Sequence, residues 1–144
     1  MEKCPSTIKQ GDSPAYLRNK EGLSAFHIAA KEGNHAVMEE LVEACPDIYE
    51  LLDNKGRTAL HVAAKSGTHR AFSFFLGRPE LKFFFDEQDK EGNTLIHLAA
   101  INDQVLLSSY LKYGRFVDLN VMNKEGFTTT DNALLRWKLN SLTV

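Results

Sequence analysis

Four segments of the chain share one pattern, in which a polar turn with a glycine precedes a short apolar helix. In the clearest copy, Leu60, Ala63 and Ala64 lie at positions i, i+3 and i+4, so one helical face is apolar and small. Gly56 gives the preceding turn the backbone freedom that a tight turn needs. Gly67 ends the helix after about two turns. A helix this short is not stable alone, so we expect its alanine face to pack against another helix.

Each short helix is predicted to begin with a hydroxyl side chain at the N-cap and a polar side chain three residues later. Thr58 and His61 hold these positions in the copy described above, where the histidine can reach back to the turn as in a capping box. The equivalent pairs are Ser24 with His27, Thr94 with His97, and Thr128 with Asp131. A carboxylate at the last of these positions is favoured by the helix dipole.

The turn glycines recur at a nearly fixed period. Gly22, Gly56, Gly92 and Gly126 are separated by 34, 36 and 34 residues. Such periods indicate stacked repeats, each unable to bury its apolar face alone. A second helix is predicted at about residues 35–44, 69–76 and 104–113, and the fourth copy has only a first helix, at about 131–138. The predicted fold class is therefore all-α, a solenoid of about three and a half stacked helix–turn–helix repeats with projecting turns.

The chain is predicted to consist of a flexible N-terminal arm, residues 1–14, and one repeat domain, residues 15–140. The repeats are expected at about 19–52, 53–88, 89–122 and, in part, 123–140. Phe83, Phe84 and Phe85 lie near the end of the second repeat. Either at least two of these rings pack beneath the long connection, or they form an exposed aromatic patch for a partner. The first repeat has no earlier repeat to cover Phe26 and Ile28, so we expect a monomer or weak self-association through uncapped ends.

Composition narrows the class of protein. The 144 residues are 43% hydrophobic, which suffices for a core, and the net charge of −2 gives no electrostatic reason to propose nucleic acid as a partner. Cys4 and Cys45 are the only cysteines, so no disulfide framework is expected and the cytoplasm is the expected location. No apolar run approaches 18 residues, so we expect no membrane span in this chain.

His27, His61 and His97 recur in register and are the obvious candidates for a metal site. Packed helices lie about 8–10 Å apart, whereas zinc takes nitrogen ligands at about 2.0–2.1 Å, so histidines one repeat apart cannot converge on one ion. We interpret them as structural, bonding within the turn and to the adjacent repeat. The chain also lacks the motifs of catalytic nucleophiles and phosphate-binding loops. The sequence therefore predicts no enzyme, no cofactor and no metal.

The run from Gly56 to Gly67, Gly-x-Thr-Ala-Leu-His-x-Ala-Ala-x-x-Gly, resembles the ankyrin repeat motif. The resemblance covers about residues 15–139 and implies an ankyrin-repeat solenoid that acts as a non-enzymatic protein–protein interaction scaffold. The chain departs from the motif after each N-cap, where the usual proline is replaced by Ala25, Ala59, Leu95 and Thr129.

Residues 44–63 and 89–94 are further similar to plant ankyrin proteins of the accelerated-cell-death type, which join an ankyrin array to a C-terminal multi-helix membrane domain, the PGG domain. This resemblance implies a role in plant defence or stress signalling. Because the chain stops at Val144, it resembles a truncated soluble member or a fragment of a longer one. The alternative that it implies is the cytosolic regulatory part of a membrane or channel-like ankyrin protein, at the cytosolic face of a membrane.

A protein partner is expected on the concave face or at the turn tips. Arg57 is the favoured polar anchor, because arginine is over-represented at binding hot spots, and Phe127 is the favoured apolar one, because a turn tip has no folding need for a large apolar group. The full set of candidate partner-binding residues is Leu23, Arg57, Lys65, Asn93, Ile101 and Phe127.

Overall fold

A computed structural model describes residues 14–78, 85–102 and 120–132. Its elements are η1 (Pro14–Tyr16), α1 (Ala25–Glu32), α2 (His35–Ala44), η2 (Ile48–Glu50), α3 (Ala59–Ser66), α4 (His69–Leu76) and α5 (Leu95–Asn102). Residues 129–132 are also helical. These segments contain no β-strand, which confirms the all-α class. The helix predicted at 104–113 and residues 1–13 of the predicted arm lie outside the described residues.

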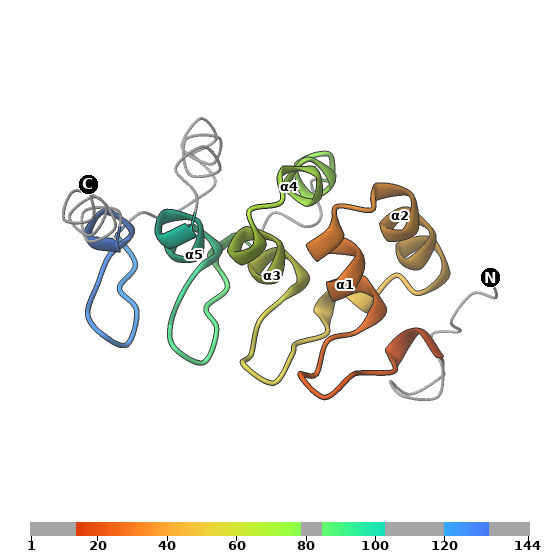
Figure 1. Ribbon diagram of the computed structural model, residues 1–144, viewed down its shortest axis with the longest axis horizontal. Coiled ribbons are helices and arrows are strands. Elements are labelled where there is room, and N and C mark those ends of the chain that lie inside the picture. The colour runs from red at the N-terminus through yellow and green to blue at the C-terminus, as the bar shows by residue number, and fades with distance from the viewer. Residues whose placement is uncertain (1–13, 79–84, 103–119, 133–144) are drawn as a thin grey trace, which may run out of the picture.

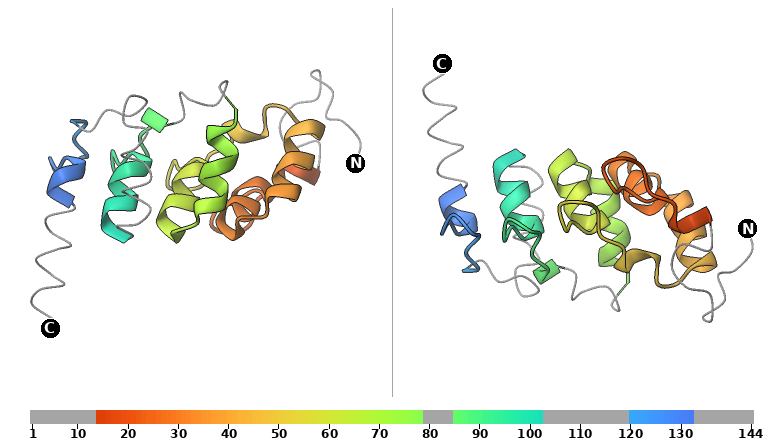
Figure 2. Two further views of the ribbon diagram at one scale, coloured as in Figure 1. Left: turned by 90° about the horizontal axis from the view of Figure 1, so that it is seen from above. Right: turned by 90° about the horizontal axis from the view of Figure 1, so that it is seen from below.

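The helices form a stack of repeats (Figure 1). Helix α3 packs between α1 and α5, while α2 packs against α1 and α4 packs against α3. The views from above and below show the repeats following one another along the long axis, from the N-terminal to the C-terminal end of the chain (Figure 2). The loops that precede α1, α3 and α5 project to one side of this stack. We call these loops fingers and number them one to four; they comprise residues 19–24, 53–58, 89–94 and 123–128.

The short helices begin through the capping box that the sequence indicates. The side chain of Thr58 accepts a hydrogen bond from the backbone N–H of His61, and the His61 ring accepts one in return from the backbone N–H of Thr58. Helix α1 repeats this arrangement with Ser24 and His27. The predicted start of the last helix, at about residue 131, is wrong: the helix begins at residue 129, because Thr128 is its N-cap.

Neighbouring fingers are joined edge to edge by backbone hydrogen bonds. The N–H groups of Asn54, Lys90 and Lys124 donate to the carbonyls of Glu21, Lys55 and Glu91, at 3.1, 2.9 and 2.9 Å. Each bond joins the second residue of one finger to the third residue of the finger before it. The fingers therefore form a continuous ladder, and each finger fixes the position of the next.

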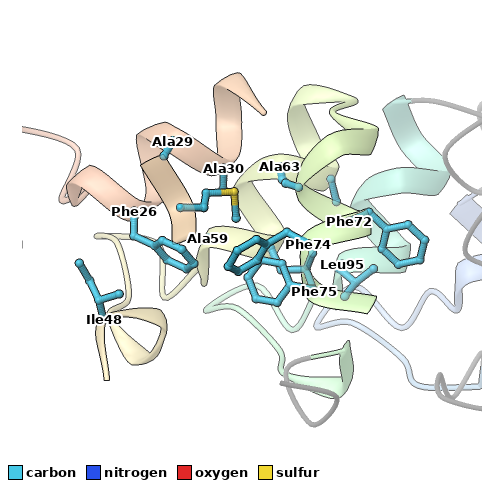
Figure 3. Close-up of a cluster of buried hydrophobic side chains, with 14 of the residues drawn as sticks. Phe26, Ala29, Ala30, Ile48, Ala59, Ala63, Phe72, Phe74, Phe75 and Leu95 are labelled. Carbon is cyan, nitrogen blue, oxygen red and sulfur yellow. The ribbon is translucent and has the colours of Figure 1, made fainter. Parts of the chain in front are cut away.

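The core crosses the repeat boundaries. Phe26 of α1 lies 6.2 and 6.1 Å, between ring centroids, from Phe74 and Phe75 of α4, and the cluster continues along the stack (Figure 3). The expectation that Phe26 is uncovered at the N-terminal end is wrong, because these rings of the second repeat bury it completely. Ile28 of α1 is 38% exposed. Aromatic rings at such distances add about 0.5–1.5 kcal/mol per pair beyond the area they bury.

One of the three consecutive phenylalanines is placed by the structure. Phe85 is buried and its ring packs edge-on against Phe72 of α4, at 5.8 Å between centroids. Of the two interpretations, packing beneath the connection therefore holds for Phe85, while Phe83 and Phe84 lie outside the described residues.

The low cysteine count led to the expectation of no disulfide framework, and the structure corrects this expectation at Cys45. It is buried at the C-cap of α2 and is disulfide-bonded. The pattern of two widely separated cysteines gave no indication of this bond. Among the residues that the structure describes, no helix is both long enough and apolar enough to cross a bilayer.

Candidate partner-binding groove

A groove of about 530 Å³ lies where the first two fingers meet the C-terminal turns of α1 and α3. Its floor includes the buried side chains of Leu23 and Val62, and the other residues that line it are polar or charged. The residues that line it are Glu21, Leu23, Lys31, Asp53, Asn54, Lys55, Arg57, Val62, Lys65 and Ser66. The ladder of backbone hydrogen bonds holds the two fingers in place, so the groove is formed before any partner arrives.

Arg57 is the most firmly held cation of the groove. Its residue is only 7% exposed, and Nε donates a hydrogen bond to Oδ2 of Asp89 at 3.3 Å. Its backbone N–H donates to Asp53 Oδ1 at 2.8 Å, and its carbonyl is 2.9 Å from Nε2 of His27. The terminal nitrogens Nη1 and Nη2 have no hydrogen-bond acceptor within residues 14–78, 85–102 and 120–132.

Asp89 belongs to the third finger and performs two tasks. Its Oδ1 accepts the backbone N–H groups of Glu91 and Asn93, each at 2.9 Å, which closes the turn of that finger. Its Oδ2 accepts from Arg57 in the second finger. The residue is 6% exposed. A buried ion pair thus couples the second finger to the third and orients the guanidinium from behind.

Lys31 and Lys65 occupy equivalent positions in the last turns of α1 and α3, where the helix dipole favours a positive charge. Both are exposed and line the groove. The pKa of Lys65 is lowered, chiefly by the positive charge of Arg57, then by partial burial and by Lys55. This shift indicates that the positive charges around Lys65 are not fully compensated by nearby carboxylates.

The three histidines in register lie behind the fingers. Nε2 of His61 is 2.9 Å from the carbonyl of Glu87 and 3.1 Å from that of Asn93, while Nδ1 accepts from the N–H of Thr58. Because both carbonyls can only accept, the proton of the neutral ring is on Nε2. Burial lowers the pKa of both His27 and His61, which favours the neutral ring. Within the described part of the chain, no group of three or more metal-ligating side chains occurs.

The structure brings together three of the six candidate partner-binding residues. Leu23, Arg57 and Lys65 line the groove, although Leu23 is only 8% exposed and therefore belongs to the floor. The assumption that residues following the turn glycine are free at the tips is wrong for Leu23, Arg57 and Asn93, because each finger folds back against its neighbour. Asn93 is 6% exposed, and its Oδ1 accepts from Nδ2 of Asn123 in the fourth finger at 3.0 Å.

The other candidates lie further along the stack. Ile101 is 46% exposed on α5, and Phe127 of the fourth finger is half-buried. Neither lines the groove. Conversely, Lys31 and Val62 line it but were not in the candidate set. Lys31 lies in the last turn of α1, at the position equivalent to that of Lys65 in α3. This equivalence was the signal that could have added Lys31 to the candidate partner-binding residues.

A protein-family model matches the N-terminal part of this chain. Residues 4–84, more than half of the chain, match a model described as ankyrin repeats in three copies. The matched range contains the first two fingers, helices α1 to α4 and every residue that lines the groove.

Proposed function

The chain belongs to the ankyrin-repeat family, and we propose that it acts as a scaffold that recognises a protein partner through the groove between the first two fingers. Ankyrin repeat domains are generally non-catalytic modules that mediate protein interactions. The observation that carries the proposal is the combination, in one groove, of a buried and firmly held arginine with exposed lysines above an apolar floor. Hot spots of protein interfaces are enriched in arginine and are surrounded by less critical contacts that exclude water.

The lining of the groove favours a protein partner over a small molecule. Sites for small molecules are lined predominantly by apolar and aromatic side chains. Here Leu23 and Val62 are the only aliphatic side chains among the ten lining residues, and no aromatic ring is present among them. The wall is formed by two separate fingers and two helices, which suits an extended segment that contacts several repeats at once.

A capture experiment with matched charge reversals tests this function. The double variant Lys31→Glu/Lys65→Glu changes exposed groove residues, and the control Glu40→Lys/Glu43→Lys changes exposed residues of α2, outside the groove. We expect the wild type and the control to capture the same proteins from the source tissue, and the groove variant to capture none of them. The melting temperatures of both variants should equal that of the wild type. Undiminished capture by the groove variant would contradict the proposal.

We propose plant defence or stress signalling as the setting of this recognition, on the strength of the resemblance carried by residues 44–63 and 89–94. The expected result is that the transcript and the captured partner both increase when the tissue is challenged with a pathogen. A transcript that does not respond to pathogen, salt or drought would contradict this setting and leave the binding function in place.

The second candidate is a cytosolic regulatory part of a longer membrane or channel-like ankyrin protein, which the same resemblance supports. An antibody raised against residues 14–78 separates the two. A band of the length of this chain in the soluble fraction supports the separate scaffold. A single longer band confined to the membrane fraction supports the regulatory part.

A further inference from the structure

Resting on the proposed function, we infer that the groove is an anion site for a carboxylate side chain, and that its occupant is an extended acidic segment of a protein partner. Arg57 is the group that would bind this carboxylate, with Lys31 and Lys65 as its flanking cations. Leu23 and Val62 form the apolar floor beneath the segment.

The first argument is that Arg57 is held in place but incompletely satisfied. A guanidinium has N–H donors on three nitrogens in a rigid fork that matches a carboxylate. Asp89 uses only Nε of Arg57, and the remaining two nitrogens have no acceptor within the described residues. The side chain of Arg57 is only 9% exposed, so it is oriented and largely dehydrated before binding, and a carboxylate that reaches Nη1 and Nη2 replaces little water.

The second argument is the balance of charge. Four cationic side chains line the groove, those of Lys31, Lys55, Arg57 and Lys65, against the carboxylates of Glu21 and Asp53. Oδ1 of Asp53 already accepts the backbone N–H groups of Lys55 and Arg57, at 2.9 and 2.8 Å. The lining therefore carries two more positive than negative charges, and two carboxylates outside it oppose this surplus: Asp89 behind Arg57, and Glu91, which raises the pKa of Lys65. A carboxylate adds less negative charge to this setting than a phosphate dianion would.

The third argument concerns Lys65. Its pKa is lowered chiefly by Arg57, so these two cations repel each other across the groove. A carboxylate placed between them would convert this repulsion into two attractions. Both Lys31 and Lys65 are exposed, and no ion pair holds either of them within the described parts of the chain.

Selection from a phage-displayed library of random dodecapeptides tests the inference. We expect the wild-type chain to select peptides that share Asp or Glu at one fixed position. Arg57→Gln should bind a selected peptide at least about tenfold more weakly, because a hydrogen bond to a charged group contributes about 1.5–3 kcal/mol. Arg70→Gln, which removes an exposed arginine of α4 outside the groove, should bind as the wild type does.

A second variant keeps the test informative if Arg57→Gln does not fold. Lys31→Gln/Lys65→Gln changes only exposed side chains, and we expect it to weaken binding of the same peptide several-fold at 50 mM salt and less at 500 mM, because salt screens exposed charges. A selected peptide in which the acidic residue is replaced by its amide should bind about as weakly to the wild type as the acidic peptide binds to Arg57→Gln.

Three outcomes would overturn the inference. Selected peptides without a shared acidic position would refute the carboxylate and leave protein recognition by the groove standing. Tighter binding of the phosphoserine version of a selected peptide, by tenfold or more, would identify a phosphate ligand instead. Absence of any enriched peptide would refute an extended segment as the occupant, while the capture experiment with the groove variant would still decide the proposed function.

Discussion

Two turns with identical sequences allow the ladder of fingers to be tested directly. Asn-Lys-Glu-Gly occurs both at residues 19–22 and at residues 123–126, and the two glycines have φ angles of +81° and +82°. In each turn the side-chain oxygen of the asparagine accepts the same two backbone N–H groups. Replacing either glycine by alanine therefore introduces the same left-handed strain, roughly 1–2 kcal/mol.

The two positions differ in what an added methyl group would meet. A Cβ atom at Gly22 would lie 2.7 Å from the backbone nitrogen of Asn54 in the second finger, whereas a Cβ atom at Gly126 meets nothing within 4 Å. The clash at Gly22 requires the two fingers to separate. This separation removes the hydrogen bond from the N–H of Asn54 to the carbonyl of Glu21 and the bond from Nδ2 of Asn54 to the carbonyl of Lys20.

The expected difference follows from these contacts. Two lost hydrogen bonds cost about 1–3 kcal/mol together, and the overpacking adds about 1 kcal/mol or more. Gly22→Ala should therefore destabilise the chain by roughly 2–4 kcal/mol more than Gly126→Ala. Urea unfolding followed by circular dichroism at 222 nm measures both free energies of unfolding. Equal losses, within about 0.5 kcal/mol, would show that the first and second fingers do not touch.

Three further predictions concern buried polar side chains. His61→Ala should lower the free energy of unfolding by about 3 kcal/mol, because it leaves the N–H of Thr58 and two carbonyls without partners. Urea unfolding should show a far smaller loss for the exposed control His35→Ala. Equal losses for the two variants would refute the capping role of His61. Acidification from pH 7.5 to 5.5 should destabilise the chain, because burial lowers the pKa of His27 and His61 and the unfolded state therefore binds protons first. The loss is about 1.4 kcal/mol per pH unit for each fully shifted group. A free energy of unfolding in urea that does not change with pH would contradict this. Burial and a hydrogen bond to Asp47 raise the pKa of Tyr16 to about 12, so stability should fall between pH 10 and 12 in the wild type and not in Tyr16→Phe, as measured by thermal melting at each pH.

The sequence predicted those features that depend on residues close together in the chain. The bounds of α2 and α4 and the N-caps of α1 and α3 agree with the structure, because caps and stop signals lie within a few residues of each helix end. The reach of His61 back to Thr58 is likewise local. The left-handed conformation at Gly56, with φ of +72°, follows from the turn itself. Such features need no knowledge of how repeats meet.

The sequence could not predict features created between repeats. Arg57 is adjacent to a turn glycine and therefore reads as exposed, yet Asp89, 32 residues later, draws its side chain against the third finger. Phe26 reads as uncovered because Phe74 and Phe75, which bury it, belong to the second helix of the next repeat. The groove depends on the same contacts, so its lining could be only partly predicted from the candidate set.

Site-specific photo-crosslinking tests most directly the claim that a protein partner occupies the groove. A benzophenone amino acid at position 65 places the reactive group in the groove, and the same group at position 43 places it on the exposed surface of α2. After irradiation in an extract of the source tissue, we predict a defined cross-linked protein with the probe at position 65 and none with the probe at position 43. Cross-linking at position 43 alone would place the partner on the outer helices and contradict the account.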